Sequence, residues 1–237
     1  MANDISLEER SAAACEFILA NQHMLASLNF PAETPRLRLA VTLLHASTSH
    51  GYTAAKLVNL SVADFGISAA ALLRPQVDTL LRGILFAMTD ETSDADVDSF
   101  IHDDKLPLRP DRKGERKTIT LSQMSAIATR LFERFPVLPD PDKFERMIKA
   151  SINDMHGLIH GGNVLLHLHN SGDGHVSFSP PMNSLTHLLR NVSSMSGIPW
   201  VVAMNLLAQQ PLPVASAALK KAYERFARAF DLPTRVS

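Results

Sequence analysis

The sequence predicts an all-α fold: a single helical bundle of about seven or eight helices with a small β-hairpin. Three observations lead to this fold class. Apolar residues recur at helical spacing through most of the chain, helix-end signals separate these stretches, and only one pair of short runs has strand character. The sequence contains no internal repeat, and we expect residues 1–237 to form one domain.

Capping residues mark the first two helices. Ser6 and Glu9 fit a capping box, in which the hydroxyl and the carboxylate satisfy first-turn amides, so a helix is expected over about 7–29. The pair Thr34–Pro35 fits an N-cap followed by proline in the first turn. The second helix is expected to continue to about Leu60.

The next apolar stretch contains a proline. Gly66 is expected to break the chain, and residues 67–88 are expected to be helical. Pro75 lacks an amide hydrogen and clashes with the preceding turn, so a kink or a helix start is expected near Arg74. Further helices are expected over about 93–101, 120–135, 141–162, 183–209 and 214–230.

Three irregular features complete the predicted fold. Two short runs around an Asn-Ser-Gly-Asp-Gly cluster predict a β-hairpin over about 164–179. Residues 105–119 combine prolines, a glycine and alternating charges, and are expected to form a surface loop. Gly197 and Pro199 are expected to bend the helix that follows the hairpin.

The composition excludes several classes of protein. The apolar fraction is 46% and the charged fraction 20%, which is typical of a globular domain, and the net charge is −1. Cys15 is the only cysteine, so an intrachain disulfide and a thiolate zinc site are excluded. No apolar run reaches the about 18 residues that a membrane helix requires. We therefore expect a cytoplasmic protein without a membrane partner, and we expect no cofactor.

The first candidate site is a ladder of charged residues. Arg74, Asp78 and Arg82 follow one another at four-residue spacing, so they lie on one side of a helix. Each arginine can reach the same carboxylate, which leaves one guanidinium for a phosphate or a carboxylate ligand. The alternative is a structural salt-bridge ladder. We call these three residues the arginine ladder.

The second candidate site is the histidine stripe, formed by Asn153, His156 and His160. Imidazoles four residues apart can orient one another or act as acid and base, and Gly161 and Gly162 allow a ligand to approach closely. The alternative is that these histidines hydrogen-bond at a helix C-terminus, where the helix dipole favours a cation.

A metal site is a further alternative. His50 is expected to face inward and could join His156 and His160, a spacing that resembles the ligands of DinB-like helical bundles. The zinc-protease signature is absent, because no glutamate follows the first histidine.

Charge is also segregated along the chain. Residues 90–104 are acidic, and residues 105–117 are mainly basic. A basic loop could contact nucleic-acid phosphates, whereas a solvated surface is the alternative.

Two resemblances follow from these residues. The segment Arg74-Pro75-x-x-Asp78-x-x-x-Arg82-Gly83, with the later His-Gly-Gly segment, resembles uncharacterised bacterial helical families with the pattern Arg-Pro-x-x-Glu-x-x-x-Arg-Gly. The likeness covers about 39–197 and implies a fold and a site. A more distant resemblance is to HEPN proteins, many of which are ribonucleases. The HEPN arginine is missing at the matching positions before His156 and His160.

We predict that the arginine ladder and the histidine stripe face each other across a groove. An arginine would bind an anion, Asp78 would orient it, and His160 or His156 would transfer a proton. The predicted function is HEPN-like binding or processing of RNA or a nucleotide in a bacterial stress or defence setting, with a homodimer implied by the HEPN resemblance. The alternatives are a non-catalytic oligomeric scaffold or binding module and a metal-dependent DinB-like enzyme.

Overall fold

The computed structural model describes residues 5–30, 34–110, 113–134, 144–146, 148, 182–207 and 216–233. Within these ranges the chain is helical apart from its connections and a two-stranded antiparallel sheet. The predicted all-α fold with a small β-hairpin is therefore confirmed, although the hairpin lies at a different place. Among the described helices, none has both the length and the hydropathy to cross a membrane.

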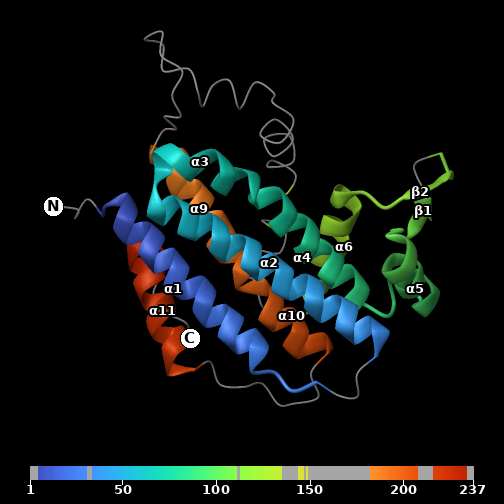
Figure 1. Cartoon of the computed structure of the whole chain (residues 1–237). Helices are drawn as coiled ribbons and strands as arrows, with labels where there is room; N and C mark the ends of the chain where they lie inside the picture. Colours follow the sequence, from blue (N-terminus) through green and yellow to red (C-terminus); the bar gives the residue numbers. More distant parts are fainter. Residues whose placement is uncertain are drawn as a thin grey trace, which may run out of the picture.

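The elements follow one another in the order shown by the colours of Figure 1. They are α1 (Leu7–Ala26), α2 (Pro35–Leu60), α3 (Val62–Ala71), α4 (Leu73–Ala87), α5 (Asp94–Asp103), β1 (Leu108–Pro110), β2 (Arg116–Thr118), α6 (Leu121–Arg134), α9 (Met182–Ser196), α10 (Ile198–Leu206) and α11 (Ala217–Ala229).

Helix α2 is the central element of the bundle. It packs against α1, α4, α3 and α9, and α11 packs along the other side of α1 (Figure 1). Helix α6 packs against α4, and together with α5 and the hairpin it lies at the side of the bundle away from α11. Two clusters of buried apolar residues fill the interior, one between α1, α9 and α11 and one around α4, α6 and α10.

Local capping chemistry explains several helix starts. Ser6 and Glu9 form the predicted capping box, and the Thr34 hydroxyl accepts a hydrogen bond from the amide of Leu37 at 3.2 Å. Ser93 and Asp96 form a second box at the start of α5. Each cap satisfies first-turn amides that lack a partner inside the helix.

The prediction of a break at Gly66 is wrong. Gly66 is a buried residue inside α3, and the chain instead leaves the helical conformation at Ser61, with φ −167° and ψ 118°. The Ser61 hydroxyl then accepts the amide of Asp64 at 3.3 Å and starts α3. The serine cap, rather than glycine flexibility, determines this boundary.

The breaks at proline and at Gly197 are confirmed. Helix α3 ends before Leu72 and α4 begins at Leu73, because Pro75 cannot donate the hydrogen bond that a continuous helix needs there. Likewise α9 ends at Ser196, and α10 begins after Gly197 with Pro199 in its first turn.

The observed hairpin occupies the region where we expected a surface loop. Leu108 pairs with Thr118 and Pro110 with Arg116 in antiparallel register, and the turn contains Gly114 at φ +80°. A positive φ is a conformation that glycine adopts readily, which allows a tight connection. The hairpin predicted over 164–179 lies outside the described residues.

Candidate functional site

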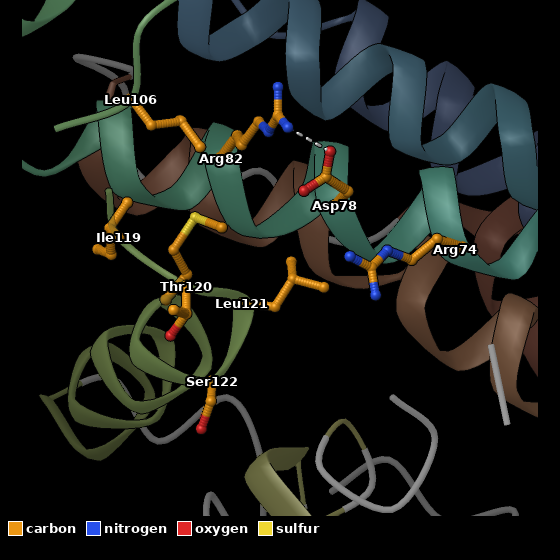
Figure 2. A pocket seen from close by; sticks show the side chains of 9 residues that line it. Arg74, Asp78, Arg82, Leu106, Ile119, Thr120, Leu121 and Ser122 are labelled. Atoms are coloured by element: carbon orange, nitrogen blue, oxygen red, sulfur yellow. Dashed lines mark ion pairs between the residues drawn. The ribbon is translucent and has the colours of Figure 1, made fainter. Parts of the chain in front are cut away.

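The arginine ladder lines a pocket on the outer face of α4. All three residues belong to this helix, which also carries the fully buried Leu80, Leu81 and Ile84. The spacing of four residues places the ladder along one side, as predicted. Figure 2 shows the three side chains above the pocket.

Arg82 is held by several contacts. Its Nη2 atom lies 2.8 Å from Oδ2 of Asp78, and its Nη1 atom lies 4.0 Å from Oδ1 of Asp104. Its guanidinium carbon is 5.6 Å from the ring centre of Phe100, a cation–π geometry. The Nε atom is buried and has no hydrogen-bond partner within the described residues. Arg82 is therefore fixed in place but has one donor left unused.

Arg74 is the second guanidinium of the pocket. It is partly buried, and it makes no ion pair within the described part of the chain. Figure 2 shows Arg82 and Asp78 directed toward each other, whereas the Arg74 guanidinium projects separately, on the side of Leu121. Among the described residues, one arginine of the ladder is thus paired with a carboxylate and the other is not.

The other lining residues come from the segment between α5 and β1, from the residues that follow β2 and from the start of α6. The pocket has a volume of about 400 Å³. Besides the ladder, its lining residues are Leu106, Ile119, Thr120, Leu121, Ser122 and Met124. The lining thus combines charged side chains on α4 with mostly apolar side chains on the facing segment.

Thr120 explains why α6 begins at the pocket. Its hydroxyl accepts a hydrogen bond from the amide of Gln123 at 3.3 Å, and its own amide donates to the Gln123 side chain at 2.9 Å. This reciprocal pair starts the helix. The first turn of α6 therefore directs the positive end of the helix dipole to the same side of the molecule as the two arginines.

The predicted histidine stripe lies outside the described residues, as do Gly161 and Gly162. The expectation that Asn153, His156 and His160 face the arginine ladder therefore stays a prediction. Phe144 and Ile148, earlier on the same predicted helix, are buried in the core cluster around α4 and α6.

Sequence reasoning missed the facing wall. Thr120 was recognisable as a helix cap, but the linear pattern contains no signal that Leu106, Leu121 and Met124 line the same pocket as Arg74. Gly83 has a structural role, because a Cβ atom there would lie 2.9 Å from the Leu44 side chain and 3.2 Å from the Leu44 amide nitrogen. It allows α4 to approach α2 closely.

The histidines of α2 do not form a metal centre with described residues. Within the described ranges, no group of three or more His, Cys, Asp or Glu side chains converges. His50 is partly buried, and burial lowers its pKa and that of His45, since both lose hydration of the charged form. The two histidines expected to join His50 lie outside the described residues.

Ion pairs engage two residues of the acidic block, Asp90 and Glu91, with one arginine of the basic block and two of α6. Glu91 lies 2.7 Å from Arg130 and also contacts Arg109, and Asp90 lies 2.9 Å from Arg134. The hydrogen bond from Arg134 lowers the pKa of Asp90. These pairs attach the hairpin and α6 to the segment that follows α4, so the charges of Asp90, Glu91 and Arg109 have a structural role.

The fold and the pocket define the class of this protein, an all-α bundle with a partly basic, partly apolar pocket on one face of α4. The chain belongs to a family of unknown function (DUF6988), whose model matches residues 44–231. Neither the curated proteins nor the solved structures contain a significant match. The match confirms that the chain belongs to an uncharacterised domain family. The HEPN likeness stays a prediction.

Proposed function

We propose that the protein binds the phosphate group of a nucleotide or of RNA in the pocket below the arginine ladder. The observation that carries the proposal is Arg74, a partly buried guanidinium that lines the pocket and makes no ion pair within the described residues. The planar donors of such a guanidinium match phosphate oxygens, which can accept two hydrogen bonds from it at once.

The charge of the lining supports an anionic ligand. The lining contains two guanidinium groups and one carboxylate, and that carboxylate, Asp78, is already engaged by Arg82 at 2.8 Å. The pocket therefore retains a positive charge at Arg74. The first turn of α6 adds a partial positive charge on the same side.

The rest of the charge distribution favours a local pocket over a broad nucleic-acid surface. The net charge of the chain is −1, and Lys105 and Arg130 are engaged by carboxylates. A protein that neutralises many phosphates loses affinity steeply with salt. We expect binding here to depend only weakly on salt concentration.

The test is calorimetric binding of adenosine monophosphate and of a short single-stranded RNA to the wild type and to Arg74→Gln. We expect Arg74→Gln to weaken binding at least about tenfold, which corresponds to about 1.4 kcal/mol. Arg228→Gln is the matched control, because Arg228 is exposed on α11, away from the pocket. Equal affinity in both variants, or no binding by the wild type, would contradict the proposal.

A catalytic role requires the histidine stripe. In the HEPN-like form of the proposal, which would suit a stress or defence setting, His160 would transfer a proton to or from RNA bound at the ladder, with His156 beside it. RNA cleavage by the wild type and by His160→Ala tests this step. Cleavage that is lost in His160→Ala with an unchanged melting temperature supports it. Absence of cleavage in the wild type would leave a binding module without chemistry.

A further inference from the structure

We infer that the ligand is a single organic phosphate monoester, whose phosphate lies at Arg74 and whose non-ionic part packs on an apolar wall of the same pocket. This inference rests on the proposed function, because it needs the phosphate subsite to exist. The inference adds two properties of the ligand: it is a single small molecule, and the part attached to the phosphate is apolar.

The apolar wall consists of Leu106, Ile119, Leu121 and Met124. Ile119 and Met124 are 3% and 2% exposed and belong to the core cluster, and Leu106 and Leu121 pack against that cluster. The wall is therefore preformed by the core, and a ligand does not have to create it. A preformed apolar surface beside a few polar groups is typical of small-molecule sites.

The polar and apolar parts of the pocket come from different elements. The guanidinium groups project from α4, whereas the apolar side chains come from the segment that follows α5, the residue after β2 and the first turns of α6 (Figure 2). A ligand that fills the pocket must contact both sides. Inorganic phosphate satisfies only the arginine side, so the lining predicts additional affinity for an esterified phosphate.

The dimensions favour one monomer over a polymer. A volume of about 400 Å³ is within the range of pockets for small ligands. Among the described lining residues there is no aromatic ring on which successive bases could stack. Lys105 and Arg109, on either side of Leu106 in the chain, are engaged by Asp103 and Glu91 and do not extend the positive charge of the pocket.

Two kinds of compound share this chemistry. In a nucleoside monophosphate the base would lie against Leu121, and in an alkyl phosphate the chain would replace the base. Each methylene group that becomes buried is worth about a fourfold gain in affinity. The experiment therefore uses both compounds.

The test compares dissociation constants of the full chain for inorganic phosphate, ribose 5-phosphate, adenosine monophosphate and hexyl phosphate. We expect at least one of the last two to bind at least about tenfold tighter than inorganic phosphate and than ribose 5-phosphate, whose body is polar. The tighter of the two identifies the source of the apolar part. In Leu121→Ala this advantage should fall at least about fourfold, while the affinity for inorganic phosphate stays the same.

Two further variants complete the design. Leu108→Ala is the matched control, because Leu108 is 47% exposed, lies near Leu106 in the chain and is not part of the lining. Leu106→Ala repeats the test from another side of the pocket if Leu121→Ala folds poorly.

The outcomes separate the two proposals. If all four compounds bind equally and Arg74→Gln weakens each of them, the proposed function stands and the apolar subsite is overturned. If affinity for RNA rises with each added nucleotide beyond the first, the single-monomer inference is overturned in favour of a polymer. If no compound binds, both proposals fail.

Discussion

Helix α4 carries polar side chains on two faces, one toward the core and one toward the pocket. On the inner face, Gln76 is fully buried, and its amide nitrogen donates to the Val192 carbonyl oxygen at 2.8 Å and to Oγ of Ser196 at 3.0 Å. On the outer face, Arg82 is paired with Asp78, and Arg74 lines the pocket without an ion pair within the described residues.

The difference between the faces is one of space as well as of charge. A Cβ atom on Gly51 of α2 would lie 2.4 Å from Nε2 of Gln76 and 2.4 Å from Oγ of Ser196, so the inner face has no room for another atom. The outer face opens into a pocket of about 400 Å³. A polar residue without free space connects helices, whereas a charged residue with a free donor and an adjacent pocket is available to a ligand.

The largest effect is expected for Gln76→Glu, which places a carboxyl group on the inner face. An unpaired buried charge costs about 3–5 kcal/mol at pH 7, measured by urea unfolding. Burial raises the pKa of the new carboxyl in the folded state, so part of the loss should disappear as the pH falls toward about 4.3, the value of an unfolded glutamate. Gln123→Glu is the control, because a glutamate at that capping position keeps the acceptor for Thr120. Wild-type stability of Gln76→Glu would show that the inner face is not closed.

A smaller loss is expected for Gly51→Ala. In an open helix this change stabilises by about 0.5–1 kcal/mol, whereas overpacking here should cost about 1–3 kcal/mol. Thermal unfolding measures the difference in melting temperature. Gly197→Ala serves for comparison, since its nearest neighbour would lie at an ordinary 3.4 Å. A melting temperature of Gly51→Ala at or above that of the wild type would refute the close contact between α2, α4 and α9.

Asp78→Asn should have a lesser effect on stability. The side chains of Arg82 and Asp78 are 26% and 24% exposed, and ion pairs with access to solvent contribute about 0–1 kcal/mol. Phosphate binding should be retained or strengthened, because the pocket loses its negative charge. A stability loss above about 3 kcal/mol would show that this ion pair, like the hydrogen bonds of Gln76, is a buried interaction that stabilises the fold.

The smallest effect on stability is expected for Arg74→Gln. Since Arg74 makes no ion pair within the described residues, the free energy of unfolding should change by no more than about 0.5 kcal/mol, even though ligand binding is weakened. Urea unfolding without ligand measures the change. A cost above about 1 kcal/mol would mean that the guanidinium supports the fold, and the contrast between the two faces of α4 would weaken.

Local signals in the sequence predicted much of the helical architecture. Ser6 and Thr34 cap helices as expected, and Pro75 and Gly197 mark helix boundaries, because each effect acts within about four residues of the chain. Gly66 was misleading because a single glycine inside a helix is tolerated when its neighbours pack well. The strands around Gly114 were missed because each has only three residues and little apolar alternation.

The sequence by itself determined the helical class, the position of the helix caps and the alignment of Arg74, Asp78 and Arg82 on one side of α4, since all of these depend on hydrogen bonds and spacing within a few turns. Only the tertiary structure decided that Arg82 is the paired arginine and that Leu121 faces Arg74. These features depend on contacts between segments tens of residues apart, such as Asp104 with Arg82 and α6 with α4. Backbone periodicity carries no information about which segments meet, because that choice depends on how all the apolar faces are buried together.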